Sequence, residues 1–442
     1  MKLYFTSLGC DKNLVDSERM LAVLADRGYT LTDNPEEADA AVVNTCCFIE
    51  DAKRESIEQI FELASLKEHG RLKVLVASGC MAERYKEQIL DEIPELDAVI
   101  GPTAFDRIAD AVDEAFEGKR PSYFQDISSD PAYASAPRIL TTGGHFAYLK
   151  IAEGCNKNCS YCAIPLFRGR YRSYPMEDLV AEARKLAEDG VKELILIAEE
   201  TTLYGTDLYG KKSLHELLEA LCKISGLRWI RILYCYPEEI YAELIDTIAR
   251  EEKICSYLDL PIQHASDRIL KAMHRRTNQA ELKELIRELR EKIPGIVLRT
   301  TLICGFPGET EEDHAELLDF VKEMRFDRLG AFCYSREEGT AAAKMKGQVP
   351  KKIKQRRYDE LMSLQQGISL ERNRARIGQV VDVFTEGSLP EEGTMCGRSY
   401  GDAPEVDGFV FYKPLTDHMS GSFARVLIEE ASEYDLYGTE VE

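Results

Sequence analysis

The sequence predicts an α/β fold in three units: an N-terminal parallel-sheet domain, a central partial barrel of six β/α units, and a small C-terminal all-β barrel. Short apolar runs alternate with amphipathic helical stretches over residues 1–120, which is typical of a parallel sheet. The same alternation begins again at Phe146. From residue 376 onward, β-branched and aromatic runs are separated by glycine-rich turns, which favours a small β-barrel.

The N-terminal domain, residues 1–120, is expected to contain four strands, each followed by a helix. The strands are predicted at residues 2–7, 41–45, 74–78 and 98–101. The helices are predicted at about 14–27, 51–67, 83–92 and 104–116. Parallel strands need a crossover connection, so each strand and helix form one β/α unit.

A linker separates this domain from the barrel. Residues 121–140 are rich in proline and small polar side chains, and we predict the linker there. The barrel is expected over residues 141–375, and a polar helix from about 351 to 376 leads out of it. Its six strands are predicted near 146–152, 193–198, 228–234, 257–262, 296–303 and 329–335. The C-terminal barrel, residues 376–442, has predicted strands at 380–385, 409–412 and 424–428.

Composition limits the location and the partners of the chain. The N-terminus lacks the apolar stretch of a signal peptide, and no stretch reaches the roughly 18 apolar residues that span a bilayer. We therefore expect a cytoplasmic protein without membrane contact, whose 13 cysteines are reduced thiols. A net charge of −22 matches a nucleic-acid backbone poorly and a basic protein well.

Three cysteines, Cys155, Cys159 and Cys162, stand together after the first barrel strand; we call them the radical-loop cysteines. They offer three thiolates without a fourth, which favours a four-iron, four-sulfur cluster with one open iron. The alternatives are unrelated thiols or a structural zinc site, which needs a closed tetrahedron. No histidine between His145 and His215 could complete a zinc site.

Three other cysteines, Cys10, Cys46 and Cys80, each follow a predicted strand of the N-terminal domain; we call them the strand-end cysteines. All strands of a parallel sheet end at one edge, where ligands bind. We therefore expect these thiols to converge and to hold a second cluster. The alternative is three chance core cysteines, because free cysteine is often buried.

These motifs resemble the radical S-adenosylmethionine (SAM) methylthiotransferases. The radical-loop cysteines, with the aromatic Tyr161 between them, resemble the radical SAM signature. Residues 9–18 and 44–46 resemble the family's N-terminal domain, and the C-terminal unit resembles a TRAM domain. One branch of the family modifies an adenosine in tRNA, and the other an aspartate in a ribosomal protein. The stretches 48–53, 259–267 and 397–408 resemble the ribosomal branch.

Charge gives separate support for the ribosomal branch. Residues 376–442 carry fourteen acidic and four basic residues. An RNA-binding module should show a basic stripe. We therefore expect this unit to repel RNA and to attract a cationic ribosomal protein, and a merely solubilising acidic face is the alternative.

The resemblance implies an enzyme that inserts a methylthio group at the β-carbon of an aspartate in a small-subunit ribosomal protein of the decoding region. It implies two 4Fe–4S clusters, one on each cysteine trio, and two molecules of SAM. The radical-loop cluster would cleave SAM to a 5′-deoxyadenosyl radical, and the strand-end cluster would deliver the sulfur. An electron donor such as flavodoxin or ferredoxin is implied as reductant. Methylthiolation of a tRNA adenosine and a non-catalytic iron–sulfur electron carrier are the two alternatives.

Contacts to SAM are predicted from position. Tyr161 would offer its backbone to the adenine. Glu199 or Glu200, after the second barrel strand, would hold the amino group or the ribose. Gly305 and Gly308 follow the fifth strand and would let the backbone approach the nucleoside.

Two further residues complete the predicted site. Gln263 is a further SAM contact, and Arg299 is a candidate for the SAM carboxylate. A helix-facing ion pair is the alternative for Arg299, and an ordinary turn is the alternative at Gly308. Arg168 opens a short basic cluster that could bind a carboxylate or lie in a solvated loop. Three features depart from the family pattern: Asp11 replaces the usual proline, Cys47 replaces the usual glycine of the ribosomal branch, and residues 198–202, with Glu199 and Glu200, differ from the more usual Gln-Asp pair. Cys47 adds a second candidate ligand, although Cys46 keeps the motif register.

Overall fold

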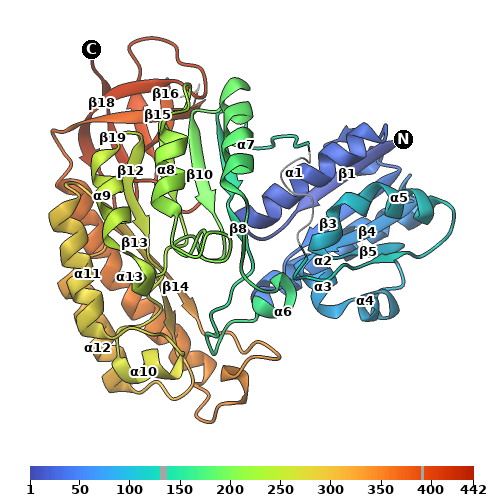
Figure 1. Ribbon diagram of the computed structural model, residues 1–442, viewed down its shortest axis with the longest axis horizontal. Helices are drawn as coiled ribbons and strands as arrows, with labels where there is room; N and C mark the ends of the chain where they lie inside the picture. The colour runs from blue at the N-terminus through green and yellow to red at the C-terminus, as the bar shows by residue number, and fades with distance from the viewer. Residues whose placement is uncertain (130–136, 390–392) are drawn as a thin grey trace.

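The computed structural model describes residues 1–129, 137–389 and 393–442, and it confirms the predicted fold class (Figure 1). A parallel N-terminal sheet lies beside an open parallel barrel, and a small closed barrel, antiparallel except for one strand pair, caps one end of the latter. One apolar core runs through all three units and includes Val42, Ile230 and Phe384. No helix of the described residues is long and apolar enough to cross a bilayer.

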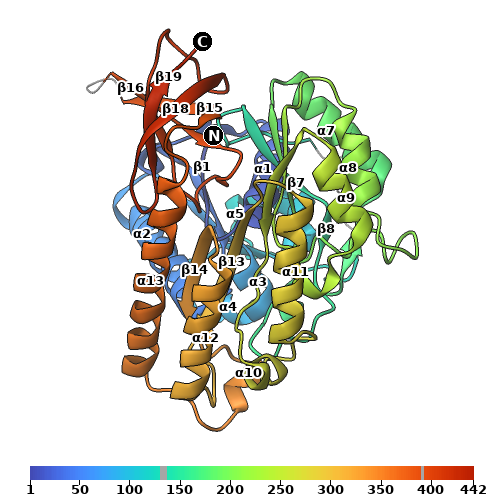
Figure 2. The same ribbon diagram turned by 90° about the vertical axis from the view of Figure 1, so that its left-hand side faces the viewer.

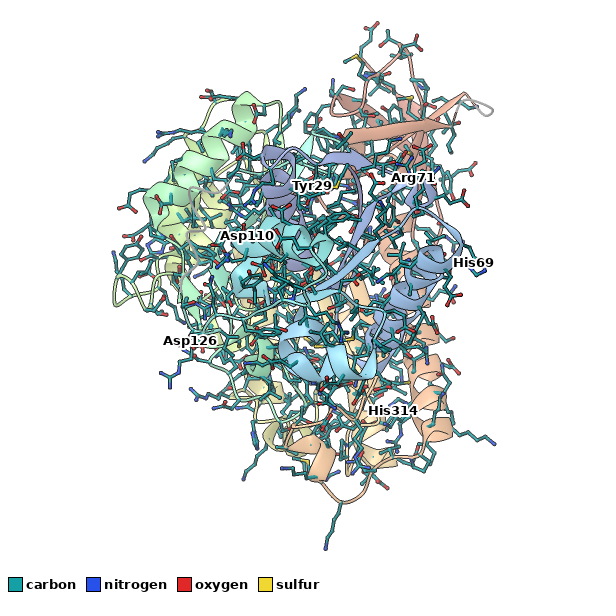
Figure 3. The ribbon with its side chains drawn as sticks, turned by 90° about the vertical axis from the view of Figure 1, so that its right-hand side faces the viewer. Tyr29, His69, Arg71, Asp110, Asp126 and His314 are labelled. Atoms are coloured by element: carbon teal, nitrogen blue, oxygen red, sulfur yellow. The ribbon has the colours of Figure 1, made fainter. Side chains whose placement is uncertain are left out.

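The N-terminal sheet has six parallel strands in the order β2-β1-β3-β4-β5-β6. The strands are β1 (Lys2–Ser7), β2 (Thr30–Thr32), β3 (Ala40–Thr45), β4 (Val74–Gly79), β5 (Ala98–Ile100) and β6 (Ser122–Tyr123). The α-helices are α1 (Asp11–Asp26), α2 (Glu50–His69), α3 (Cys80–Tyr85), α4 (Glu87–Glu92) and α5 (Ile108–Phe116). Figure 3 shows the outer face of this domain, with His69 exposed at the end of α2.

Three features of this domain differ from the predictions. Strands β2 and β6 are too short to show periodicity in the sequence. Strand β6 extends the sheet into the predicted linker, of which residues 130–136 lie outside the described part of the chain. The helix predicted at 83–92 is broken into α3 and α4 by Lys86, whose φ of 47° lies in the left-handed region.

The central unit is an open sheet of six parallel strands in the order β14-β13-β12-β11-β10-β7. These strands are β7 (Phe146–Lys150), β10 (Glu193–Ile197), β11 (Trp229–Ile232), β12 (Ile254–Asp259), β13 (Val297–Cys304) and β14 (Arg328–Cys333), and a small pair is formed by β8 (Ala152–Glu153) and β9 (Arg172–Ser173). The helices are α6 (Pro165–Arg168), α7 (Met176–Glu188), α8 (Leu214–Cys222), α9 (Ala242–Arg250), α10 (Asp267–Ala272), α11 (Gln279–Lys292), α12 (Glu311–Met324) and α13 (Lys351–Arg374). Figure 2 shows α11, α12 and α13 standing side by side outside the strands.

The C-terminal unit closes in the order β15-β16-β17-β19-β18. Its strands are β15 (Val380–Leu389), β16 (Thr394–Ser399), β17 (Val410–Lys413), β18 (Phe423–Ala431) and β19 (Leu436–Glu440). This barrel sits on the amino ends of the central strands: Phe384 packs on Trp229 with ring centres 5.8 Å apart, and Arg398 Nη2 lies 2.6 Å from Glu193 Oε2. The radical loop follows the opposite, carboxyl end of the strands (Figure 1).

Candidate functional site

The strand-end cysteines lie together at the carboxyl edge of the N-terminal sheet. Cys10 precedes α1, Cys46 follows β3, and Cys80 is the first residue of α3. Cys46 is close enough to Cys10 for their charges to interact, and Cys80 is within the same reach of both. Cys47 is also within reach of Cys80, so this edge of the sheet gathers four thiols.

Asn13 ties the three cysteine-bearing loops to one another. Its side-chain nitrogen donates to Leu8 O at 2.8 Å and to Thr45 O at 3.1 Å, just before Cys10 and Cys46. Its side-chain oxygen lies 3.5 Å from Cys80 Sγ. Asn13 is fully buried, so these contacts are protected from water and hold the loops in one arrangement.

Gly9 lets the first loop pass directly against Cys46. Its φ is +92°, and a Cβ at this position would lie 2.8 Å from Cys46 Sγ. A side chain at residue 9 would therefore push against the thiol, and glycine is the residue that fits.

The radical-loop cysteines occupy the turn between β8 and α6. The pKa of Cys162 is raised first by burial and then by its neighbours Cys159 and Cys155, so the three thiols share one site. Cys155 Sγ accepts the backbone N–H of Lys157 at 3.4 Å, and Cys159 Sγ lies 3.4 Å from the hydroxyl of Tyr236. These contacts come from the loop itself and from the end of a neighbouring strand, so the fold orients the thiols before any metal is bound.

Cys46 and Cys155, one thiol of each trio, are protonated at neutral pH without metal. Burial raises the pKa of Cys46 to about 11 and that of Cys155 to about 12. Iron must bind thiolates, so loading must release protons. Among the described residues, no three His, Cys, Asp or Glu side chains are close enough to share one metal ion. A zinc ion needs all of its thiolate sulfurs at about 2.3 Å from the one metal. In a four-iron cluster each cysteine binds a different iron, so the three sulfurs can lie farther apart.

A buried group of charges crosses the domain boundary between Cys80 and α6, the helix that follows the radical loop. Arg168 Nε donates to Cys80 Sγ at 3.2 Å, and Nη1 donates to Asp16 Oδ2 at 2.8 Å and to Glu153 Oε1 at 3.0 Å. Lys150 Nζ lies 2.5 Å from each of the same two carboxylates. Arg168 is 4% exposed, so the expectation of a solvated loop is wrong at this position.

A second set of contacts crosses the same boundary. Lys12 Nζ lies 3.2 Å from the ring centre of Tyr234, which follows β11, and 2.9 Å from Asp11 Oδ1. The Tyr234 hydroxyl lies 3.2 Å from Asp11 Oδ1. Glu199, after β10, influences the pKa values of both Lys12 and Cys162. The two cysteine trios therefore lie on facing sides of one boundary.

The predicted SAM residues Glu199 and Glu200 lie beside the radical loop. Both influence the pKa of Cys155, and each has a buried Oε2 without a hydrogen-bond partner among the described residues. Burial raises the pKa of Glu199, and it raises that of Glu200 to about 7. A buried carboxylate with a free oxygen is suited to an amino or hydroxyl group of a ligand.

The other predicted SAM residues differ in their burial, backbone conformation and neighbours. Tyr161 is half-buried, and its hydroxyl lies near Cys159. Gln263 has a φ of 72°, an uncommon conformation for a residue other than glycine, which marks a constrained position. A Cβ on Gly305 would lie 2.3 Å from Lys354 Cγ, so its near neighbour is a protein side chain. The N–H of Gly308 donates to Gly347 O at 2.8 Å. A nucleoside contact at these glycines stays a prediction.

Arg299 is held in an ion pair, but its partners lie on strand β12 and in the C-terminal barrel and not on a helix. Its Nη1 lies 2.8 Å from Asp259 Oδ1, and its Nε lies 3.6 Å from Asp407 Oδ1 of the C-terminal barrel. The guanidinium is thus already neutralised by two carboxylates. This geometry disfavours Arg299 as the partner of the SAM carboxylate.

Three family descriptions match successive parts of the chain. Residues 2–101 match the uncharacterized protein family UPF0004, 149–321 the radical SAM superfamily, and 377–441 the TRAM domain. Curated proteins named ribosomal protein uS12 methylthiotransferase RimO match over the full length. The one from Lachnoclostridium phytofermentans is 58% identical over 99% of this chain and 100% of its own length. The one from Pelotomaculum thermopropionicum is 52% identical over 100% and 99%, respectively.

The chain belongs to the RimO family of radical SAM methylthiotransferases. It is an enzyme of this class, with SAM and an iron–sulfur cluster as cofactors. Solved structures agree on the fold. The radical SAM methyltransferase TsrM from Kitasatospora setae, with cobalamin and a [4Fe-4S] cluster bound, has a TM-score of 0.55 and 14% identity, covering 92% of this chain and 81% of its own.

Sequence reasoning missed several residues of the site. Asn13 lies three residues after Cys10, about one helical turn, and therefore on the same face of the helix. This spacing could have predicted that Asn13 lies at the strand-end site. The sequence places Arg168 in a short basic cluster, but its burial against Cys80 depends on how two domains pack. Tyr234 and Tyr236 carry no motif, and only the tertiary structure brings them to the site.

Proposed function

We propose that this chain methylthiolates the β-carbon of an aspartate in ribosomal protein uS12, the small-subunit protein in the names of its relatives. The proposal rests above all on one observation: Arg168, six residues beyond Cys162, is hydrogen-bonded to Cys80. A radical generated at one trio and a sulfur held at the other must meet on one substrate carbon. Two trios on facing sides of one boundary suit that requirement.

The residues present fit two 4Fe–4S clusters. Each trio is buried or half-buried and contains three cysteines, and glycine at residue 9 keeps any side chain from pressing on the Cys46 thiol. Cys10, Cys46 and Cys80 would hold one cluster, and Cys155, Cys159 and Cys162 the other. When bound, the clusters and SAM supply a carbon radical and a transferable methylated sulfur.

The chain's own residues bind, orient and exclude water. Glu199 and Glu200 would hold the amino group or ribose of SAM through their free oxygens, with Tyr161 and Gln263 as further contacts. Lys12 and Tyr234 close the boundary beside Glu199. A dry, closed site protects a reactive carbon centre from side reactions.

The C-terminal barrel would attract the basic ribosomal substrate. Two of its four basic residues are already engaged: Arg398 lies between Glu193 of the central unit and Glu386 of the barrel, and Arg425 donates a hydrogen bond to the C-terminal residue. Exposed acidic residues include Glu405, Asp417 and Glu430. Because this barrel caps the amino ends of the central strands, a substrate docked there must extend along the molecule to reach the cysteines.

A deletion strain tests the proposal. Mass spectrometry of uS12 should show loss of the methylthio group, whereas bulk tRNA from the same strain should keep its methylthioadenosine. Loss from tRNA alone would favour the tRNA-modifying branch.

Anaerobic incubation of the loaded protein with SAM, and with a reductant such as dithionite or reduced flavodoxin, should yield 5′-deoxyadenosine. Its absence would favour an electron carrier.

A further inference from the structure

Arg168 of the central unit contacts the sulfur of a cysteine in another domain. It ends α6, which packs against α3, whose first residue is Cys80. Its Nε–H is directed at Cys80 Sγ at 3.2 Å, while its two other nitrogens bind Asp16, Glu153 and the side-chain oxygen of Asn13. All three guanidinium nitrogens therefore donate a hydrogen bond, and the acceptor of one of them is the Cys80 sulfur.

The four charged side chains that pair directly with one another at Arg168 balance in charge without Cys80. Arg168 and Lys150 carry two positive charges, and Asp16 and Glu153 carry two negative charges. The side chains of all four are less than 10% exposed. An iron cluster on thiolates adds negative charge next to this group, and the Nε–H···S contact then becomes a charge-assisted hydrogen bond. Hydrogen bonds to cluster sulfurs and nearby charge are among the factors that set reduction potential.

We propose that Arg168 is the positioning residue through which the radical loop holds the strand-end cluster and raises its reduction potential. The inference rests on the proposed function, because it requires a cluster on Cys80. The couple is the one-electron reduction of that cluster, and Arg168 transfers no proton because a guanidinium stays charged. One loop thereby carries the ligands of one cluster and the hydrogen-bond donor of the other.

The test uses the full-length chain with Cys155→Ala, Cys159→Ala and Cys162→Ala, reconstituted anaerobically with iron and sulfide. This single-site chain should hold about four irons, all at the strand-end cysteines. Its midpoint potential is measured by redox titration with electron paramagnetic resonance of the reduced cluster. A single-site chain without iron would overturn the proposed function and this inference together.

Arg168→Met in the single-site chain should lower the midpoint. At a fixed applied potential the ratio of reduced to oxidised cluster should fall at least tenfold, which is 59 mV for a one-electron couple. Arg168→Lys keeps the charge but not the planar donor edge. Its midpoint potential should therefore lie between that of the single-site chain and that of Arg168→Met. Arg19→Met is the matched control: Arg19 is 1% exposed and pairs with Glu182 of α7 across the same domain boundary. It should leave the midpoint unchanged.

A double variant separates the sulfur contact from the net charge of the buried group. Asp16→Asn with Arg168→Met keeps this group neutral, since Lys150 and Glu153 remain paired. Its midpoint should still be lower than that of the single-site chain, because the hydrogen bond to Cys80 is missing. Unchanged midpoints in Arg168→Met and in the double variant, with iron retained, would overturn the inference and leave the proposed function intact. Loss of iron from both, but not from Arg19→Met, would support the positioning role.

Discussion

Cys46 and Cys47 are neighbours in the chain, but their surroundings differ. The backbone of Cys46 exchanges two hydrogen bonds of 3.0 Å with Ser56 Oγ, and its thiol lies against Gly9. Cys47 is fully buried in a second apolar cluster together with Ile60 and Met81. The loop after β3 therefore presents Cys46 to the strand-end site and gives Cys47 mainly a packing role.

Substituting each cysteine tests this assignment. Cys46→Ala should lose about half of the iron of the fully loaded chain, because one of two clusters is lost. Cys47→Ala should keep its iron and lose a little stability through a small core cavity. Iron and sulfide analysis of anaerobically purified protein measures both. The opposite pattern would make Cys47 the ligand.

Strand ends are the elements that create the strand-end site. In the N-terminal sheet, the predicted strands coincide with β1, β3, β4 and β5 to within one residue at either end. The central strands agree to within two residues at either end, because they are apolar runs between helices, except that the strand predicted at 257–262 is β12, three residues earlier. β16 and β19 were missed because glycine and charged residues interrupt their pattern. The break at Lys86 was missed because local sequence does not reveal a left-handed residue inside a helical pattern.

Substitution of two glycines at element boundaries distinguishes the effect of backbone strain from that of a steric clash. Gly9 has a φ of +92° and would place a Cβ 2.7 Å from Cys46 Cβ, whereas Gly28 has a φ of +97° and nothing within 4 Å. Alanine at either position should cost on the order of 1–3 kcal/mol for the strained backbone. Gly9→Ala should in addition lose iron from the strand-end site. Denaturant unfolding and iron analysis check this, and equal iron loss in Gly28→Ala would refute the steric explanation.

At the scale of the whole molecule, buried ion pairs attach the C-terminal barrel to the central strands. Glu193 Oε1 lies 2.8 Å from Arg231 Nε, and Glu193 Oε2 lies 2.6 Å from Arg398 Nη2. Burial by itself raises the pKa of Glu193, but Arg398 and Arg231 together hold it below its ordinary value. Glu193 and both arginines are buried, so removing one partner would leave charge in the interior without full compensation.

Removing one partner of this pair should be costly. Arg398→Met should destabilise the protein by about 3–5 kcal/mol, because it leaves a buried carboxylate with one cation in place of two. The exposed Arg425→Met on β18 is the control and should change the free energy of unfolding by less than about 0.5 kcal/mol. Denaturant unfolding measures both. A small effect of Arg398→Met would mean that apolar packing holds the interface.

The same pair predicts the acid sensitivity of the interface. Because the folded pKa of Glu193 lies below the unfolded value, its stabilising contribution is present at neutral pH and is lost as pH falls through the folded pKa. The unfolding temperature should therefore fall less steeply below about pH 4.3, the ordinary glutamate pKa, in Glu193→Gln than in the unsubstituted chain. Calorimetry across that range checks the slope. An identical pH dependence would rule out Glu193 as a contributor.

The sequence by itself determined the order of the elements, the family and the two cysteine trios. Apolar periodicity and motif spacing are local, and the rule that parallel strands end at one edge carries Cys10, Cys46 and Cys80 into one site. Only the tertiary structure decided that Arg168 reaches Cys80, that Arg299 is occupied by Asp259, and that the acidic barrel caps the end of the strands remote from the cysteines. Those contacts join residues far apart in the chain, and their geometry depends on how whole domains pack, which no local pattern encodes.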